Sequence, residues 1–431
     1  MVDRYETCAK TARLQDIITH FLALPADALS GNRQDICEMV DILVALTDID
    51  LTPGSKLDYA SSTDGGKGVS LITAGRCALE YMRSQVFIRG CYQAICDQKT
   101  GTKPVEVLYG GTGPFGLLIV PLLPLFSPSD IQVTLLDIHQ SSLEYVQKLI
   151  DVLGVQDRIR AIECVDILKW PVPDASYDVI VSETMTARLH AEPQVAIFAH
   201  LVKGLKTDGA LVPQSVMIEG ALVSQREQLA DPLPIGRFFT LDRETATALN
   251  AGNMKCLKGR FPAPVQTTPS HHTLQITTDI CVYDRHFLGM NQCSLNLPLR
   301  YDIADISQDS RFDIEYVMSA TPKLVVRHLA VPVVPESPVW SDESPSGLPV
   351  VPTLWRYLQH QKTAHNAGGV SVSPAQSQQV IVALNLDFPE DLPAIYACET
   401  LEELETLIFS RNGGTASPDL RARLKAFARA A

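Results

Sequence analysis

The chain has 431 residues, of which 46% are hydrophobic and 20% charged, and a formal net charge of −13 at pH 7. This length exceeds what one compact core supports, and the apolar content excludes disorder of the whole chain. The acidic balance argues against a nucleic-acid partner, because phosphate recognition needs a basic surface.

The ten cysteines are scattered and form no C-x-x-C pair, which is typical of a reducing compartment rather than of a disulfide framework or a zinc site. The N-terminus shows no apolar segment after a basic one, so no secretory signal is expected. The longest apolar run, residues 117–126, is too short to cross a bilayer. We therefore expect a cytoplasmic protein with no membrane partner.

Residues 1–100 show the periodicity of helices. Apolar residues recur at helical spacing over 17–22 and 36–44, and a long helix is expected over about 71–96. Small and polar residues over 61–68 are typical of a loop. We predict an N-terminal helical domain that forms a lid or a dimer surface.

From residue 105 short apolar segments alternate with helical ones. Strands are expected over 105–109, 131–136, 160–164 and 177–182, and a helix over 195–205 precedes a fifth strand that begins at 210. This alternation is typical of βαβ units, which form a parallel sheet with ligands at the carboxyl ends of its strands. We predict a Rossmann-like, doubly wound α/β domain over residues 101–214.

Beyond residue 214 the alternation stops. Extended segments are expected over 216–223, 273–283, 293–301 and 323–334, so residues 215–431 are predicted to form a mostly antiparallel β-rich domain. Loop-like stretches at 336–352 and 366–376 interrupt it, and a short basic helix is expected from residue 419.

A glycine-rich turn, Gly111-Thr-Gly113-Pro-Phe-Gly116, directly follows the first predicted strand. Glycine lets the backbone turn sharply and approach a nucleotide, and the next helix N-terminus would offer free N–H groups. Asp137 ends the second strand, where a carboxylate can accept hydrogen bonds from both ribose hydroxyls. Dinucleotide-dependent oxidoreductases share these two features, so by themselves they leave the cofactor open.

The acidic residues after the third and fourth strands favour S-adenosylmethionine (SAM). Asp166 follows the third strand, where SAM enzymes place an acidic residue against the adenine amino group. A helix N-cap is the other interpretation of Asp166. The fourth strand begins at Asp178 and ends at Glu183, beside the expected position of the transferred group.

The most specific pattern is Glu183-x-Met185-x-x-x-Leu189-x-x-Glu192. One carboxylate at a strand end and one beyond a loop can converge on a single pocket and grip a guanidinium or ammonium group. This grip would align the nitrogen with a sulfonium methyl group, and mutual repulsion would raise one carboxyl pKa so that it accepts the released proton. The alternative is that Glu192 only begins a helix beside Pro193.

These segments resemble the protein arginine methyltransferases, within the class I SAM-dependent methyltransferases. That family carries an E-x-M-G-x-x-L-x-x-E loop, of which only the glycine is changed here, to Thr186. The step from Lys206 to Pro213 is similar to the family's entry into its fifth strand, and Arg83-Ser-x-x-Phe87 resembles its R-T-x-x-Y/F helix. The resemblance covers residues 80–223.

The resemblance implies SAM as the cofactor. Gly111, Gly113 and Gly116 would line it. Asp137 would contact the ribose, and Arg83 would pair with the methionine carboxylate. The resemblance also implies a possible homodimer.

The resemblance further places Glu183 and Glu192 on the nitrogen that is methylated, and aligns His200 with the family's histidine. The chain departs from the family in having Tyr109 where an acidic residue usually precedes the glycine turn. It also lacks the Y-F-x-x-Y element and the Thr-His-Trp triplet, for which His328 is the nearest candidate. Because these elements shape the peptide channel, we predict N-methylation of a small amine or guanidine compound that is arginine-like.

Three other functions stay open at this point. Tyr109 and the Pro114-Phe115 turn could reorient the methionine moiety, so that the aminocarboxypropyl group is attacked and methylthioadenosine released. An NAD-dependent oxidoreductase would use the same glycine turn. A SAM-binding partner protein without catalysis would use the C-terminal region. No metal site is expected, because His271 and His272 have no carboxylate or cysteine at ligand spacing nearby.

Overall fold

The structure is a computed structural model that describes residues 4–29, 31–52, 60–224, 232–267, 271–303, 306–329, 381–382, 384–387 and 389–413. The chain separates into two compact units, residues 1–331 and 332–431. The features expected at 336–352, at 366–376 and from residue 419 lie outside the described residues. The division into domains at 1–100, 101–214 and 215–431 stays a prediction.

The N-terminal helices are α1 (Arg4–Ala23), α2 (Arg33–Thr47), α3 (Leu71–Cys77) and α4 (Tyr81–Gln98). The prediction of a single helix over 71–96 is wrong, because residues 78–80 interrupt it and separate α3 from α4. There Leu79 N donates to Arg76 O at 3.0 Å and Glu80 N to Cys77 O at 3.1 Å, which are three-residue turns that end α3. The hydroxyl of Ser84 donates to the carbonyl of Ala78 at 2.8 Å, which satisfies an acceptor that the break leaves free.

The segment expected as a loop at 61–68 is an antiparallel hairpin of β1 (Ser61–Thr63) and β2 (Gly66–Gly68). Gly66 has φ +155°, and a Cβ there would lie 2.7 Å from the backbone nitrogen of Pro193. Only glycine therefore lets this hairpin approach the chain near residue 193 so closely. The sequence pattern reads as a loop because both strands are only three residues long.

The central sheet has five parallel strands: β3 (Val105–Gly110), β4 (Ile131–Asp137), β5 (Ile159–Cys164), β6 (Tyr177–Ser182) and β7 (Leu205–Val212). Their order is β5-β4-β3-β6-β7, and helices α5 (Gln140–Leu153) and α6 (Gln194–Leu201) join successive strands. The predicted α/β sheet is confirmed. Because the chain reverses its direction across the sheet at β3, a crevice is expected at the carboxyl ends of β3 and its neighbours.

The strands β3 and β4 are almost continuously apolar and buried, as strands covered on both faces must be. The α-helix expected directly after the glycine turn is absent. The chain instead makes turns and a 3₁₀ helix, η1 (Val120–Leu125). Pro121 and Pro124 explain this correction, since they have no backbone N–H to donate to a helix and their rings clash with the preceding turn.

The described strands between residues 215 and 329 form two antiparallel sheets, as expected. One has the order β12-β11-β8-β9 with β13 paired to β11, and the other the order β10-β14-β15. The expected strand at 293–301 begins instead as a 3₁₀ helix, η7 (Ser294–Asn296). The elements are β8 (Ser215–Val223), β9 (Leu233–Asp242), α7 (Arg243–Asn250), η6 (Met254–Leu257), β10 (Lys258–Pro262), β11 (Thr273–Tyr283), β12 (His286–Leu288), η7, β13 (Leu299–Asp302), β14 (Arg311–Val317) and β15 (Lys323–Leu329).

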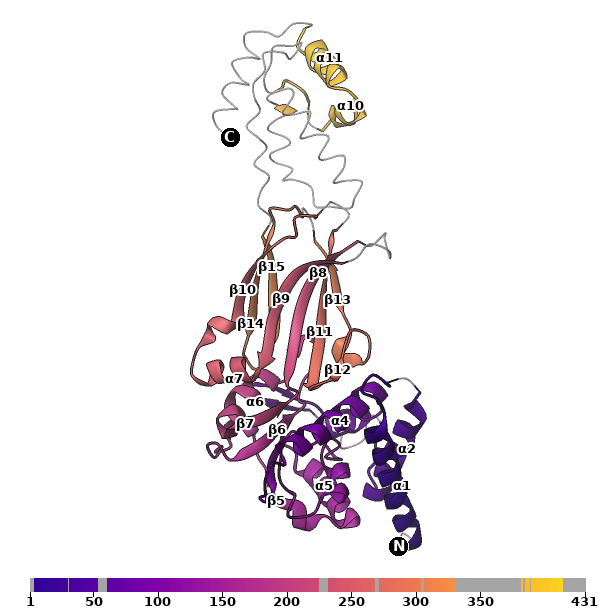
Figure 1. Ribbon diagram of the computed structural model, residues 1–431. Coiled ribbons are helices and arrows are strands. Elements are labelled where there is room, and N and C mark those ends of the chain that lie inside the picture. Colours follow the sequence, from indigo (N-terminus) through magenta and orange to yellow (C-terminus); the bar gives the residue numbers. More distant parts are fainter. Residues whose placement is uncertain are drawn as a thin grey trace. The chain divides into compact units, whose positions relative to one another are not determined.

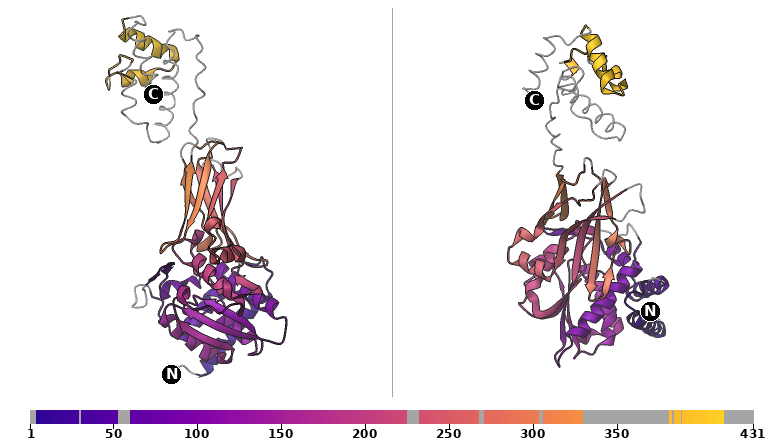
Figure 2. Two further views of the ribbon diagram at one scale, coloured as in Figure 1. Left: turned by 90° about the vertical axis from the view of Figure 1, so that its left-hand side faces the viewer. Right: turned by 45° about the horizontal axis from the view of Figure 1, so that its top comes forward.

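Helix α4 connects the parts of the first unit. It packs against α1 and α2 on one side and against β11, β12 and β7 on the other (Figure 1). Figure 2 shows the antiparallel strands clustered beside the parallel sheet in two further views. A buried apolar core runs without interruption from α1 through the parallel sheet to β14, so the antiparallel sheets are part of the body that carries the crevice.

In the second unit, the described residues form α10 (Leu392–Ala397) and α11 (Leu401–Arg411). Helix α11 begins with a capping box in which the Thr400 hydroxyl accepts from Glu403 N and the Glu403 carboxylate accepts from Thr400 N. Arg411 donates to the buried Asp391 carboxylate at 2.5 Å. No helix in the described parts of either unit is long and apolar enough to cross a membrane.

Candidate active site

A cavity of about 610 Å³ lies at the carboxyl ends of β3, β4 and β6, within the size range of small-molecule sites. Helices α3 and α4, the β1–β2 hairpin and η7 complete its wall. Of the eight site residues predicted from the sequence, Gly116 does not line this cavity. The other seven do, namely Arg83, Gly111, Gly113, Asp137, Asp166, Glu183 and Glu192.

The glycine turn places its backbone against the cavity. Gly111 and Gly113 have φ angles of +77° and +58°, in the left-handed region that favours glycine. A Cβ at Gly111 would lie 2.4 Å from the Thr184 methyl carbon, so the turn also fits closely against the chain after β6. Gly116 has φ +52° and its carbonyl accepts from Val120 N at 2.8 Å, which starts the turns after the loop.

Asp137 is 5% exposed and accepts three hydrogen bonds in this structure. Its Oδ2 accepts from Gly113 N at 3.0 Å and from the Thr112 hydroxyl at 3.3 Å, and its Oδ1 accepts from His139 N at 2.8 Å. Because a carboxylate offers about four acceptor positions, these three bonds leave about one, on Oδ1, for a further donor. The carboxylate therefore both fixes the glycine turn and faces the cavity.

Asp166 is a helix N-cap that also lines the cavity, and its contact with adenine stays a prediction. Its Oδ1 accepts from Leu168 N at 3.1 Å, which caps the 3₁₀ helix η3 (Ile167–Lys169). Its Oδ2 lies 3.3 Å from Lys169 Nζ. The residue also lines the cavity beside Ile167 and Leu168, so capping holds this carboxylate at the cavity wall.

Glu183 and Arg83 form a buried ion pair in the cavity. Nη2 of Arg83 lies 2.7 Å from both carboxylate oxygens of Glu183, and Nη1 lies 3.4 Å from Glu80. Burial, the largest single effect, lowers the pKa of Arg83, but Glu183 together with Cys77 and Glu80 outweighs burial, so the pKa lies above its ordinary value. Burial raises the pKa of Glu183, and Arg83 offsets part of that rise. Arg83 thus holds Glu183 in place.

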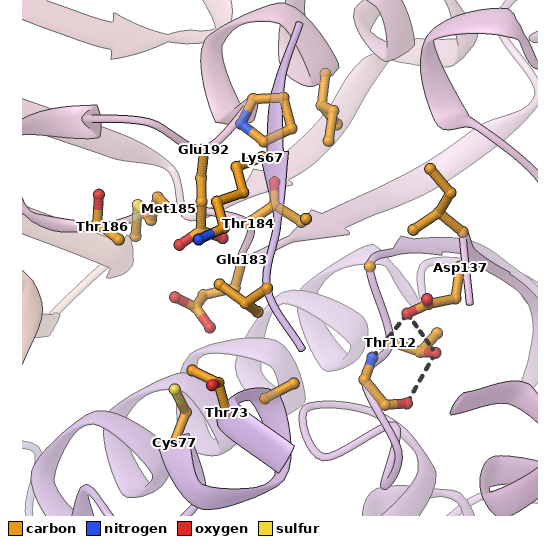
Figure 3. A pocket seen from close by; sticks show the side chains of 18 of the residues that line it. Lys67, Thr73, Cys77, Thr112, Asp137, Glu183, Thr184, Met185, Thr186 and Glu192 are labelled. Atoms are coloured by element: carbon orange, nitrogen blue, oxygen red, sulfur yellow. Dashed lines mark hydrogen bonds between the residues drawn. The ribbon is translucent and has the colours of Figure 1, made fainter. Parts of the chain in front are cut away.

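Glu192 lies in the same cavity and is 8% exposed. Burial, and next the negative charge of Glu183, raise the pKa of Glu192 to about 8, while Arg83 and Lys67 act against the rise. Figure 3 shows Glu183, Glu192 and Lys67 on one side of the cavity, apart from Asp137 and Thr112. The two carboxylates line one cavity, and the pKa values of both are raised, with burial as the main cause and their mutual repulsion a smaller one for Glu192.

The loop from 183 to 192 is held in a strained conformation. Arg188, Leu189 and Ala191 have φ angles of +61°, +53° and +65°, which cost energy for residues with a Cβ. The Tyr316 hydroxyl of β14 donates to Leu189 O at 2.7 Å, and Ala191 N donates to Pro322 O at 2.7 Å. The antiparallel sheets therefore fix the loop that carries the two glutamates.

Other contacts of the site were missed in the sequence. The buried Gln194 side chain accepts from Thr184 N at 2.8 Å and donates to Ser182 O at 2.9 Å, which fixes the start of the loop. Glu80 accepts from Ser294 N at 2.9 Å and from the Ser294 hydroxyl at 2.7 Å. Lys67 N donates to Ala191 O at 2.8 Å, so the hairpin brings a lysine to the glutamate pair. These residues have no local pattern that marks them.

The two histidines that the family resemblance singled out, His200 and His328, lie outside the cavity. His200 Nε2 lies 2.8 Å from Trp170 O, so His200 is placed by a packing contact. His328 lies on β15, with its ring 5.5 Å from that of Phe312. Neither residue lines the cavity. Within the described ranges, no group of three or more His, Cys, Asp or Glu residues could hold a metal ion.

The Glu192 pKa leads to a prediction about stability. An unfolded glutamic acid titrates near its ordinary pKa of 4.5, whereas folded Glu192 titrates near 8. Between these values the folded state binds the extra proton, so Glu192 makes the wild type less stable as the pH rises. Glu192→Gln should therefore match the wild type at pH 5 and be more stable at pH 9. The expected gain at pH 9 is at least about 1 kcal/mol, since one pKa unit corresponds to about 1.4 kcal/mol.

Urea unfolding of both proteins between pH 5 and pH 9 measures this difference. Glu106→Gln is the control, because Glu106 pairs with Arg160 at an exposed site on β3, away from the cavity. A difference between wild type and Glu192→Gln that stays constant over this range would contradict the raised pKa.

A family model described as a methyltransferase domain matches residues 107–209, which run from β3 into β7. This match agrees with the parallel sheet, with the glycine turn after β3 and with the acidic residue that ends β4. The chain therefore contains a class I SAM-dependent methyltransferase domain, with SAM as its cofactor. The match favours methyl transfer over the NAD-dependent oxidoreductase that the glycine turn alone left open.

Two individual proteins are similar to parts of this chain. An uncharacterized protein of Haemophilus influenzae (strain ATCC 51907 / DSM 11121 / KW20 / Rd) is 29% identical over 84 residues, which is 20% of this chain and 33% of that protein. This chain thus spans a third of the length of that curated relative. Among solved structures, the Trypanosoma brucei PRMT1 enzyme-prozyme heterotetrameric complex with AdoHcy is similar with a TM-score of 0.39 and 14% identity, over 57% of this chain and 94% of that one.

Proposed function

We propose that this protein transfers a methyl group from SAM to a nitrogen atom of a small amine or guanidine compound. The observation that carries the proposal is that Glu183 and the buried Glu192 line the same cavity as the glycine turn and Asp137. Arg83 already holds Glu183, whereas the Glu192 carboxylate forms no hydrogen bond or ion pair with any described residue. A cationic ligand in the cavity would supply the charge-assisted hydrogen bonds that Glu192 lacks.

The residues of the cavity fit SAM. The size of the cavity suits a nucleoside cofactor together with a small methyl acceptor. The Asp137 carboxylate can accept hydrogen bonds beside Gly113, where the backbone is open: the nearest atom to an added Cβ would be Ala74 Cβ at 3.4 Å. Apolar side chains of Ile138 and Ile167 form the adjacent wall. When bound, SAM supplies an electrophilic methyl group on a sulfonium centre.

The two glutamates would have different tasks. Arg83 fixes Glu183, so this carboxylate is suited to orient the acceptor nitrogen. Glu192 has a pKa of about 8, close to the pH at which an enzyme works, so its carboxylate can take the proton that the nitrogen loses when the new N–C bond forms. The acceptor must then reach both carboxylates at once, which restricts it to a slender amine or guanidine group.

Tyr109 favours a second candidate reaction, in which the aminocarboxypropyl group of SAM is attacked instead of the methyl group. Its phenol is buried, its pKa is raised well above the ordinary value by burial and by Glu183, and it stands at the cavity where the resembling family has an acidic residue. A neutral phenol would hold the amino group of the methionine moiety less firmly than a carboxylate. An attack on the aminocarboxypropyl group is the alternative that this residue favours.

One experiment separates the two reactions. The full chain is incubated with SAM, labelled on the methyl group, and a pool of amines and guanidines, and the products are identified by mass spectrometry. N-methylation yields S-adenosylhomocysteine and a labelled acceptor, whereas the alternative yields labelled methylthioadenosine. Methylthioadenosine as the main product would overturn the proposal, and so would SAM binding without any product from the pool.

A further inference from the structure

A second cavity, of about 380 Å³, lies between the glutamate loop and the antiparallel strands. Arg188 and His190 line both this cavity and the one that holds Glu183 and Glu192, so the two cavities meet at these residues. The remaining wall comes from β11, β13 and β15. Its residues are Ile276, Leu299, Tyr301, Lys323, Leu324, Val325 and Val326.

The second cavity has the opposite charge to the first. Arg188, His190 and Lys323 contribute basic groups, and no aspartate or glutamate is found among the described residues that line it. Tyr301 adds a phenol whose pKa burial raises to about 12, so it stays a hydrogen-bond donor. Basic groups and a phenol around an apolar floor are suited to an anionic group.

Arg188 lines the second cavity without a charged partner among the described residues. Its backbone N donates to the Thr278 hydroxyl at 3.0 Å, and its φ of +61° lies in the left-handed region, so the backbone at this residue is held in place. Its guanidinium forms no hydrogen bond or ion pair with any described residue, and burial lowers its pKa with no carboxylate to offset the effect. A partly buried arginine without a counter-charge is costly unless a ligand supplies one.

We propose that the second cavity binds an anionic group, a carboxylate or a phosphate, at the far end of the acceptor whose nitrogen lies at Glu183 and Glu192. This inference rests on the proposed function and narrows its substrate class to amines and guanidines that also carry an anion. The cation would be held by the glutamates and the anion by Arg188, with Lys323 adding long-range attraction. A molecule with only the cationic end would leave Arg188 unpaired.

Two matched pairs of probes test the inference. L-Arginine and agmatine differ by a carboxylate, and O-phosphoethanolamine and ethanolamine differ by a phosphate. Binding is measured by calorimetry on the full chain saturated with S-adenosylhomocysteine, and methyl transfer is measured separately with labelled SAM. In at least one pair, the anionic member should bind at least about tenfold more tightly than its partner, and the pair that shows this preference identifies the anion.

Arg188→Met should reduce that preference to about twofold or less, because it removes the charge and keeps a side chain of similar length. Both residues have a Cβ, so the backbone strain at this position is unchanged. Arg237→Met is the control: Arg237 pairs with Glu219 at an exposed site on β9, and its loss should leave the preference as in the wild type. If Arg188→Met does not fold, Lys323→Met, at an exposed position, should reduce the preference in the same direction.

The outcomes separate this inference from the proposed function. Equal binding within both pairs, an unchanged preference in Arg188→Met, or no binding of any probe at about 10 mM would overturn the anionic subsite. Methyl transfer to probes that show no anion preference would keep the proposed function and overturn the subsite alone. An anion preference without any methyl transfer would support the subsite and contradict the proposed function.

Discussion

Glu183→Gln is expected to lower kcat/KM for the methylated acceptor at least about 100-fold, because it removes the carboxylate that positions the acceptor nitrogen. Arg83 holds Glu183 through both carboxylate oxygens at 2.7 Å, so the wild-type carboxylate has little freedom to point elsewhere. The amide keeps the shape of the side chain but loses the negative charge that attracts a cation. Steady-state kinetics with labelled SAM, together with SAM binding by calorimetry, measures the effect.

The loss of activity has to be separated from a loss of the fold. Glu183→Gln leaves the Arg83 guanidinium buried without its main counter-charge, which destabilises the folded state. Glu183→Asp keeps that charge and shortens the side chain by one methylene, so it should fold and still lose about tenfold or more of kcat/KM. Glu106→Gln, far from the cavity, should keep wild-type rates. If Glu183→Gln and Glu192→Gln both folded and turned over normally, the roles assigned to these residues would be wrong.

Gly111→Ala is expected to reduce the free energy of unfolding by about 2–5 kcal/mol and to abolish tight SAM binding. A left-handed conformation costs an alanine about 1–2 kcal/mol, and forcing a methyl group into a packed site costs about 1–3 kcal/mol more. The new Cβ would lie 2.4 Å from the Thr184 methyl carbon. Thr184 has little room to move, because its N and its hydroxyl both donate to the Gln194 side chain, at 2.8 and 2.9 Å.

Gly154→Ala provides the matched control for the backbone term. Gly154 ends α5 with φ +68°, and a Cβ there meets no atom within 4 Å. Its substitution should therefore cost only the left-handed penalty of about 1–2 kcal/mol and leave SAM binding intact. Thr184→Ser removes the clashing methyl and keeps the hydroxyl, so adding it to Gly111→Ala should restore part of the stability. Urea unfolding of the wild type, Gly111→Ala, Gly154→Ala and the double variant Gly111→Ala/Thr184→Ser tests this. Equal losses of unfolding free energy in the two glycine variants would contradict the close fit at Gly111.

Much of the parallel sheet could be predicted because its signals are local. The strands β3, β4 and β6 are short apolar runs, and the cavity is lined by Gly111, Asp137 and Glu183 at or directly after their ends. This pattern is written within a few neighbouring residues. The two helices from 71 to 98 could not be separated in this way. Apolar spacing continues across residues 78–80, and the break is made by turns and by the contact of Ser84 with Ala78, which no periodicity shows.

In the candidate site, too, the local motifs could be predicted from the sequence and the contacts between distant segments could not. The glycine turn, Asp137 and the glutamate pair are marked by local residue types and spacing, so the sequence alone predicted that they lie together, and their predicted site residues line one cavity except for Gly116. Their surroundings come from distant segments: Lys67 from the hairpin, Tyr316 from β14 and Ser294 from η7. Such contacts depend on how whole sheets and helices pack.

The sequence by itself determined a SAM-dependent methyltransferase domain and predicted a pocket with two glutamates, because both follow from residue types placed at strand ends and in the loop after β6. Only the tertiary structure decided that Arg83 pairs with Glu183, that the antiparallel sheets hold the glutamate loop, and that a basic cavity adjoins the acidic one. The physical reason is that charge pairing and burial depend on distance in space, and segments far apart in the chain become neighbours only when the core packs.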